Sequence, residues 1–417
     1  MEQRKRLLLL LSFALSVFIA TYAAVSTRTI TVTNPATAIQ KNVPVVLPVN
    51  TFSGRGKINV VSCAVFVGKE QIPSQLDDLN HDGIPDEMAF LVDLSPKQKL
   101  KVTIYMASDS SLFTSFALRT HAQMWRKNPV TKEITPTIEE SSPTGNLYQS
   151  LHHHGPAFES EYMAYRLYFD EKQTVDIYGK KKHRLELMDT KWYPTDQQLA
   201  EGYGDDILWV KATSGCGTLK GWDGEKAISV APVSNRTARI LASGPVRSVV
   251  EMEADGWQYQ GKTVNLRERF IIYAGHRDVE VHVFQNEETT LCVGVQTFFD
   301  QSEKMSDISG VQAIWGTGLQ YPYSDNPRAQ PQTVGLAVYV PGTVLQKPAY
   351  DNDNLLLIIK GKDFKYHFMA VWDKEDAGFN TATDFFDYVK EWKGRVSTQY
   401  SVNNSFRSNQ ACSCIIF

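Results

Sequence analysis

Short runs of β-branched and alternating residues, separated by turn residues, follow one another along nearly the whole chain. Runs of this kind form β-strands rather than helices. Helical patterns are confined to residues 195–201, where Thr195 can cap the helix, and to residues 383–392, where Thr381 or Thr383 can do so. The pattern therefore predicts an all-β chain built as a large antiparallel β-sandwich.

Turn-rich stretches and shifts in composition divide the chain into parts. The stretch 108–145 has mixed polarity, three prolines and a Ser-Ser-Pro-Thr-Gly end, which is typical of a connector. Longer strand signals follow, with hairpin turns expected at residues 256–257 and 275–277. The predicted organisation is a signal peptide at 1–24, a small N-terminal β-sandwich region at 25–107, a connector at 108–145 and a large β-sandwich domain at 146–417.

The first two dozen residues have the pattern of a secretory signal. A basic start at residues 4–6 is followed by an apolar run at residues 7–20 and then by small residues. The apolar run is shorter than a membrane-spanning helix, and no later run reaches that length, so we expect no membrane span in the mature chain. No cysteine follows the apolar run, which argues against a lipid anchor. The sequence predicts a periplasmic or secreted protein.

The charge balance excludes one class of partner. Lys and Arg total 43 against 46 for Asp and Glu, and without the predicted signal peptide the totals are 40 and 45. A mildly acidic chain is not expected to bind nucleic acid. A local group of basic residues can still bind an acidic polysaccharide. The five cysteines are scattered and indicate no disulfide framework, although an exported protein permits one.

The segment Asp77-Asp78-Leu79-Asn80-His81-Asp82-Gly83-Ile84-Pro85-Asp86-Glu87 places oxygen-bearing side chains at alternating positions around a glycine. Four of its residues match the first, third, fifth and ninth positions of a calcium loop: Asp78, Asn80, Asp82 and Asp86. The twelfth position holds Ala89 instead of a bidentate Glu. The segment therefore predicts either a shortened, structural calcium site or an Asx-rich turn without metal.

A histidine-rich loop at residues 152–154 runs into the segment 159–168, which carries Tyr and Arg residues. We expect His154, directly before a Gly-Pro turn, to be a general base or a donor to a uronate. Alternation along a single strand places Glu159 and Tyr165 on one face and the set Tyr162, Arg166 and Tyr168 on the other. The second set resembles a strip for binding an acidic sugar. The alternative is an aromatic strand with an ion-paired arginine.

Further candidates lie in glycine-rich loops and at one hairpin. Long loops of this kind are costly unless they line a site, and Trp rings stack well on sugars. Adjacent aspartates can serve as acid or base, although they more often cap a turn. The hairpin places a histidine where it can reach a cleft or lie on the surface. These candidates are Lys191, Trp192, Tyr193, Asp205, Asp206, Trp222, His276 and Arg277.

Several stretches together resemble a bacterial family of unknown function that is found beside unsaturated glucuronyl hydrolases in polysaccharide-degradation gene clusters. The residues that carry the resemblance are Gln75 with the Asp-rich loop to Glu87, His154-Gly155-Pro156, residues 165–170, Asp176-Ile177-Tyr178-Gly179-Lys180, Gly215-Cys216-Gly217, Gly244-Pro245-Val246-Arg247 and Ala274-Gly275-His276-Arg277. The resemblance covers nearly the whole mature chain. It implies a galactose-mutarotase-like supersandwich, a scaffold that hosts polysaccharide lyases and hydrolases.

This resemblance, with the site residues above, predicts an exported enzyme that degrades uronic-acid-containing polysaccharide or oligosaccharide, most plausibly by β-elimination. Arg166 would neutralise the uronate, His154 would be the base, and Tyr165 or Tyr193 the acid. A glycoside hydrolase or mutarotase-type epimerase would instead use His154 or His276 with Glu159, Glu161, Asp205 or Asp206. A non-catalytic glycan-binding protein is the alternative of another class. Expected substrate-binding residues are Glu159, Tyr162, Lys191, Trp192, Trp222 and Arg277, and no organic cofactor is expected.

Overall fold

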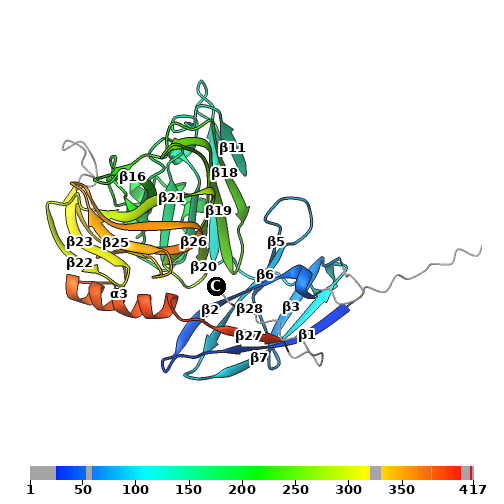
Figure 1. Cartoon of the computed structure of the whole chain (residues 1–417). Helices are drawn as coiled ribbons and strands as arrows, with labels where there is room; N and C mark the ends of the chain where they lie inside the picture. Colours follow the sequence, from blue (N-terminus) through cyan, green and yellow to red (C-terminus); the bar gives the residue numbers. More distant parts are fainter. Residues whose placement is uncertain (1–24, 53–58, 320–329, 377, 405–413, 416–417) are drawn as a thin grey trace, which may run out of the picture.

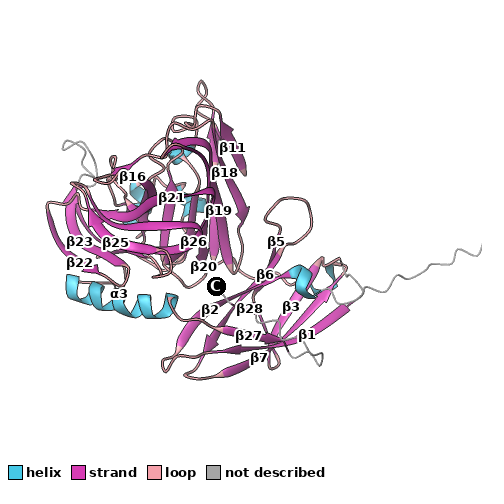
Figure 2. Ribbon diagram, in the orientation of Figure 1, coloured by secondary structure: helices cyan, strands magenta, loops and turns pink. Residues whose placement is uncertain are grey.

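The computed structural model describes residues 25–52, 59–319, 330–376, 378–404 and 414–415. The predicted signal peptide lies outside the described residues. Most of the described chain is strand, which confirms the predicted all-β, sandwich-like class. Two sandwiches lie side by side, the smaller one built mainly from the N-terminal residues (Figure 1). Figure 2 shows how few helices accompany the strands.

The small sandwich packs a six-stranded sheet on a three-stranded sheet. The larger sheet has the order β28-β27-β1-β7-β3-β4 and the smaller one the order β2-β6-β5. Alternation along the strands turns every second side chain inward, and the inward set forms one apolar core that includes Ile30, Val45, Phe90 and Ile104. The strands are β1 (Val25–Thr33), β2 (Gln40–Pro48), β3 (Ser62–Val67), β4 (Glu70–Ile72), β5 (Ser74–Asp77), β6 (Glu87–Leu94), β7 (Lys99–Ala107), β27 (Ser401–Asn404) and β28 (Cys414–Ile415).

One edge of the small sandwich is made by residues from near the end of the chain. The sequence analysis assigned all of 146–417 to the large domain, but β27 pairs with β1 in the register Val32↔Val402. The Val402 side chain is only 2% exposed and completes the core of the small sandwich. Burial of an apolar side chain and pairing of the β1 edge both favour this arrangement.

The large sandwich contains a 12-stranded sheet with the central order β11-β18-β19-β20-β21-β26-β24-β23-β22. Strands β16, β17 and β25 join it at the side, through β21 and β26. Its strands are β11 (Glu139–Ser142), β16 (Cys216–Trp222), β17 (Ala227–Ile228), β18 (Asn235–Ala242), β19 (Arg247–Tyr259), β20 (Lys262–Tyr273), β21 (Asp278–Gln296), β22 (Gln301–Asp307), β23 (Val311–Leu319), β24 (Pro331–Tyr339), β25 (Leu345–Tyr350) and β26 (Asn354–Trp372).

A five-stranded sheet with the order β15-β14-β13-β12-β8 packs on this large sheet. Aromatic side chains from both sheets meet in the core, where the rings of Tyr165 and Phe368 lie 5.2 Å apart and those of Phe158 and Phe270 lie 6.2 Å apart. The five strands are β8 (Thr120–Gln123), β12 (Ala157–Ser160), β13 (Met163–Leu167), β14 (Val175–Gly179) and β15 (Asp205–Asp206). A separate two-stranded ribbon joins β9 (Trp125–Lys127) and β10 (Ile134–Pro136).

The predicted connector at 108–145 is part of the large domain. Strand β8 extends the five-stranded sheet and β11 pairs with β18 of the large sheet. Its prolines do not break these strands, because Pro136 ends β10 while Pro129 and Pro143 lie in turns. Mixed polarity here reflects short edge strands rather than a linker.

The helices are few and short. Thr195 caps α2 (Asp196–Ala200) in a capping box, and Thr381 caps α3 (Ala382–Val396), so the predicted helices are confirmed and Thr381 is the cap. Helix α3 packs Phe385 and Trp392 on the outer face of β23, β24 and β26 and leads into β27 (Figure 1). The remaining helical turns are α1 (Leu187–Thr190), η1 (Val49–Phe52), η2 (Ser110–Leu112) and η3 (His152–His154). None of the helices in the described ranges combines the length and apolarity needed to cross a bilayer.

Buried charges join the two sandwiches. Arg247 of β19 is 1% exposed and donates through Nε to Asp77 of β5, at 2.7 Å, and through Nη2 to Glu87 of β6, at 2.6 Å. Beside it, Gln75 donates to the Arg247 carbonyl oxygen at 3.0 Å and accepts from the Arg247 backbone amide at 3.2 Å. Two of the stretches that carry the family resemblance therefore meet at this junction.

Replacing Arg247 by Met is expected to lower the free energy of unfolding by about 3–5 kcal/mol, because it leaves the buried Asp77 carboxylate without its cation. Urea unfolding of the two proteins measures the difference. Arg239→Met is the control, since Arg239 pairs with the more exposed Glu139 and Glu253 and its loss should cost no more than about 1 kcal/mol. Equal losses in both variants would contradict a junction held by Arg247.

Candidate functional site

The hairpin of β12 and β13 positions the candidate site. Glu159 lies opposite Ala164 and Ala157 lies opposite Arg166, so Glu159 and Arg166 project from the same face of the sheet. The sequence analysis placed Glu159 with Tyr165 instead. That assignment was wrong because the chain turns at residues 161–162, which resets the alternation. Tyr165 points the other way, into the core between the sheets.

Arg166 forms the base of the site. Its side chain is 5% exposed, and Nη2 donates to the carboxylates of Asp176 at 2.6 Å and Asp206 at 2.9 Å. Nη2 also donates to the Tyr168 hydroxyl at 2.9 Å, while Nη1 donates to the Tyr193 hydroxyl at 3.1 Å. Asp176 is the cross-strand partner of Arg166 on β14, and Asp206 comes from β15. Charge-assisted bonds of this kind fix both the cation and the groups around it.

Aromatic rings surround the guanidinium. Its carbon lies 4.5 Å from the centre of the Trp192 ring and 4.9 Å from that of Tyr168, which is cation–π distance. The Trp192 indole also donates to Asp206 at 3.0 Å. Lys191 and Trp192 have φ values of 47° and 77°, a conformation that costs non-glycine residues about 1–2 kcal/mol. This strained turn after α1 places Trp192 under Arg166 and Tyr193 beside it.

Asp206 is the titratable carboxyl of the group. Burial, with the nearby charge of Asp176, raises the pKa of Asp206 to about 7, although Arg166 opposes the shift. Asp206 therefore exchanges a proton near neutral pH. Two carboxylates that share one cation in a poorly hydrated site commonly differ in this way, and such groups are suited to acid–base chemistry.

His154 lies next to this group with its ring stacked on Tyr148, at a centroid distance of 3.8 Å, and edge-on to Tyr168. Its Nδ1 is 2.8 Å from the Tyr148 carbonyl oxygen, so Nδ1 carries the hydrogen and Nε2 keeps a lone pair. Burial and the charge of Arg166 together lower the pKa of His154 to about 4, although the hydrogen bond to the Tyr148 carbonyl oxygen opposes the shift. The imidazole is neutral at physiological pH and is able to accept a proton or a hydrogen bond.

The neighbouring histidines make other contacts. The Nε2 of His152 lies 3.1 Å from the Lys191 carbonyl oxygen, and its ring lies edge-on to Tyr193 at a centroid distance of 5.5 Å. His153 is buried against Trp192. Of the three, His154 is the one that contacts both Tyr148 and Tyr168.

The outer rim of the site is aromatic and basic. Tyr193 is 43% exposed. The Lys172 ammonium lies 5.5 Å from the ring centre of Tyr148, and Lys191 lies 5.6 Å from that of Trp125. Rings that present a face to solvent can stack on sugars, and the two ammonium groups favour an anionic ligand. The site thus has a buried ionic base, the partly exposed Tyr193 side chain and a basic rim.

The structure brings together only part of the predicted set. Arg166 contacts Trp192 and Tyr193 directly, and His154 packs on Tyr168, which accepts a hydrogen bond from Arg166. Lys191 lies at the rim, and Asp205 lies beside Asp206 on β15. Glu159 is on the same sheet face but is buried against Lys180 and the amides of Glu186 and Leu187. The remaining predicted residues lie away from the Arg166 group.

These five residues have other contacts. The Tyr165 hydroxyl donates to the Arg277 carbonyl oxygen at 2.5 Å and accepts from the Ala370 amide at 3.0 Å, so it is part of the core. Arg277 pairs with Glu375 and lies 5.3 Å from the Tyr162 ring. Trp222 packs at the edge formed by β16 and β17. His276 lies at the junction between the sandwiches. Glu161, named for the hydrolase alternative, accepts from Arg119.

Sequence reasoning missed the role of Asp176, Tyr148 and Lys172. Asp176 opens one of the stretches that carry the resemblance, and an aspartate inside a fully buried strand needs a buried cation as partner. An aspartate within an otherwise apolar strand was therefore the feature of the sequence that could have identified Asp176. Tyr148 and Lys172 had none, because both reach the site from turns.

The family described as a domain of unknown function, DUF4861, matches residues 32–402. The chain belongs to the DUF4861 family. No curated protein matches the sequence. Among solved structures, an alpha-mannosidase from Enterococcus faecalis V583 is 9% identical with a TM-score of 0.43, over 92% of this chain and 46% of its own. A glycosyl hydrolase family 38 protein from Enterococcus faecalis is 10% identical with a TM-score of 0.45, over 93% and 49%. This DUF4861 chain spans about half the length of those two proteins.

The predicted calcium loop joins β5 and β6. Asp78 accepts the Gly83 amide at 2.7 Å, Asn80 accepts the Asp82 amide at 2.9 Å, and Asp86 accepts the Leu79 amide at 2.8 Å. In the part of the chain that the structure describes, no three His, Cys, Asp or Glu side chains are arranged to hold a metal ion. The geometry favours the Asx-rich turn without metal, one of the two predicted alternatives, and the calcium alternative is open to the following test.

Calcium should therefore leave the thermal midpoint of unfolding unchanged, because the loop oxygens are already bonded to backbone amides. Differential scanning calorimetry in excess Ca²⁺ and in excess EGTA tests this. A midpoint that rises with Ca²⁺ in the wild type but not in Asp78→Asn would show that the loop binds the ion after all.

The free energy of unfolding should depend on the protonation of Asp206. Its pKa is about 7 in the folded chain and about 3.9 in an unfolded one, so the folded state holds an extra proton between these values and stability falls as pH rises through that window. Asp206→Asn removes this loss. Relative to the wild type, the variant should gain about 2 kcal/mol between pH 5 and pH 8 in urea unfolding.

The control for this experiment is Asp189→Asn, at an exposed carboxylate bonded to Tyr203. Its stability should follow the wild type across the same pH range. A parallel course for Asp206→Asn would mean that Asp206 is ionised throughout.

Proposed function

We propose that this chain acts on uronic-acid-containing polysaccharide or oligosaccharide by β-elimination at the site around Arg166. The observation that carries the proposal is the position of Tyr193, whose hydroxyl is bound by a buried arginine while its ring is open to solvent. A neutral imidazole and a carboxyl that titrates near pH 7 lie in the same group. Proton donor and proton acceptor are the two functions that such a reaction requires.

The role of Arg166 differs from the one that the resemblance implied. Two carboxylates already share its guanidinium, so its charge is not available to neutralise a uronate. Lys172, at the rim over Tyr148 and Tyr168, is 27% exposed and has one partner, the Asp170 carboxylate at 3.4 Å, so it is the cation better placed to pair with a uronate carboxylate. Arg166 instead holds the Tyr193 hydroxyl in place. Of the two tyrosines expected as the acid, we propose Tyr193, because Tyr165 lies in the core.

The proposed elimination consists of two proton transfers. His154 Nε2 takes the proton from the carbon next to the carboxylate, and the electron pair of that C–H bond forms the new C=C bond. The bond from the adjacent ring carbon to the leaving oxygen breaks, and that oxygen takes the proton of the Tyr193 hydroxyl. Burial raises the pKa of Tyr193, which keeps its hydroxyl protonated before the step.

One observation favours a non-catalytic glycan-binding protein as the second candidate. The Arg166 guanidinium and the carboxylates of Asp176 and Asp206 are bonded to one another, and the aromatic, basic rim alone suffices to bind an acidic glycan. Hydrolysis has less support, because the buried Asp176 and Asp206 bind the same Nη2 and do not flank a substrate. We further propose export to the periplasm or medium, from the apolar leader.

The test is incubation of the mature protein with ulvan, pectins, alginate and glycosaminoglycans while following the absorbance of unsaturated uronate. Tyr193→Phe should reduce the rate at least about 100-fold, because it removes only the transferable proton. Tyr203→Phe is the matched control, since Tyr203 is bonded to the exposed Asp189. Affinity gels with the same glycans report binding separately. Glycan retardation without any unsaturated product would favour the binding protein.

A further inference from the structure

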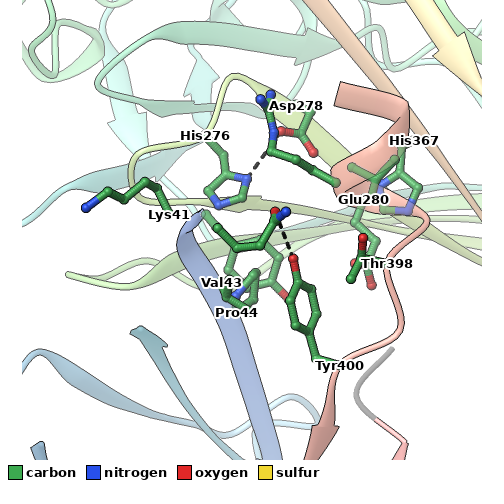
Figure 3. Close-up of a pocket in the computed structure, with 13 residues that line it drawn as sticks. Lys41, Val43, Pro44, His276, Asp278, Glu280, His367, Thr398 and Tyr400 are labelled. Atoms are coloured by element: carbon green, nitrogen blue, oxygen red, sulfur yellow. Dashed lines mark hydrogen bonds and ion pairs between the residues drawn. The ribbon is translucent and has the colours of Figure 1, made fainter. Parts of the chain in front are cut away.

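A cavity lies between the two sandwiches, away from the Arg166 group. It has a volume of about 90 Å³ and is lined by β2 of the small sandwich, by β20, β21 and β26 of the large sheet, and by the segment 395–400. Figure 3 shows His276, Asp278 and His367 above Val43, Pro44 and Tyr400. Three parts of the chain that are distant in sequence thus build one cavity, at the junction that Arg247 holds.

The acidic side chains of this cavity already have partners. His276 Nδ1 lies 3.2 Å from Asp278, and its Nε2 lies 2.8 Å from the Asn42 carbonyl oxygen. Two acceptors require two N–H groups, so this imidazole is protonated. Burial alone lowers the pKa of His276, but the hydrogen bond and charge of Asp278 raise it. Glu280 is bonded to His282 and to Lys365, at 3.1 Å from the latter.

Arg395 leaves the cavity with an excess positive charge. Among the described residues, no carboxylate lies within ion-pair distance of its guanidinium, which faces the Tyr388 ring at 5.0 Å. Lys41, at the cavity edge, is paired with Asp93. With Asp278 and Glu280 balanced by His276 and Lys365, one cation remains without a counter-charge. The cavity therefore favours a ligand with a single negative charge.

His367 provides a second, independent indication of a ligand. Its side chain is 9% exposed, and its Nδ1 is buried with no hydrogen-bond partner among the described residues. Burial lowers the pKa of His367, so the ring is neutral and offers one donor and one acceptor. A buried polar atom without a partner is costly, and a ligand hydroxyl that reached this ring would remove that cost.

We propose that this cavity binds the carboxylate end of a single uronic acid unit, an inference that rests on the proposed function. Arg395 pairs with the carboxylate, while His367 and the oxygens of Asp278 and Glu280 take up the hydroxyl groups. A volume near 90 Å³ holds the end of one sugar unit and not a polymer segment. The site is thus a place for a chain end or a released unit, separate from the reacting site at Arg166.

Isothermal titration of the full mature chain with D-glucuronate, D-glucose and acetate tests the proposal. Glucuronate should bind more tightly than both of the others. Arg395→Gln should weaken glucuronate about 10- to 100-fold, because a charge-assisted pair is lost, and Arg395→Lys should weaken it less. Lys390→Gln is the matched control on the same helix, since Lys390 pairs with the exposed Asp387, and it should bind as the wild type.

Tyr193→Phe separates the two sites. Unchanged glucuronate binding in that variant, with loss in Arg395→Gln, supports the junction site even if no uronate glycan is ever cleaved. Loss in Tyr193→Phe with no change in Arg395→Gln would place the bound sugar at Arg166 and overturn the inference. Equal affinity for acetate or glucose, or no glucuronate binding at all, would overturn it as well.

Discussion

The contact of Arg247 with Asp77 and Glu87 holds charged groups of the two sandwiches against each other. Each sandwich has its own apolar core, and a smaller apolar cluster, in which Val46 and Leu91 pack near Val249 and Ile271, crosses the junction. Apolar contacts tolerate small rotations, but a buried cation with two carboxylates does not, because a rotation would leave charges without partners in a poorly hydrated place. The orientation in turn brings β2 against β20 and β21, and so forms the wall of the junction cavity.

The Arg166 group, like the junction, consists of a buried arginine paired with two carboxylates. A cross-strand pair, Arg166 with Asp176, lies on the face of a sheet that the strained turn at Lys191 and Trp192 covers. The second carboxylate, Asp206, is then forced to keep a proton up to about neutral pH. Rigid burial of one arginine therefore both orients an exposed tyrosine and adjusts the acidity beside it.

Alternation and capping residues made most strands and both longer helices predictable, because those signals act within a few residues. Other features depend on contacts that no local pattern contains. The turn after Ser160 reversed the facing of Glu159, and Gly256 forms a bulge within β19, where its φ is 68°, instead of the predicted hairpin. His154 and Arg166 could be picked out for their chemistry. The sequence offered Asp205 and Asp206 equally as an acid or base, and only the distance from Asp206 to Arg166 identifies Asp206 as the member of the site.

The pairing of β1 with β27 has a consequence for how the chain acquires its structure. Ile30 meets Asn404, so the ribosome must finish nearly the whole described chain before this edge can close. Closing so large a loop is slow, and until then β1 presents an open edge that could pair with other chains. A late-arriving strand thus leaves the small sandwich incomplete until nearly all of the described chain has been synthesised.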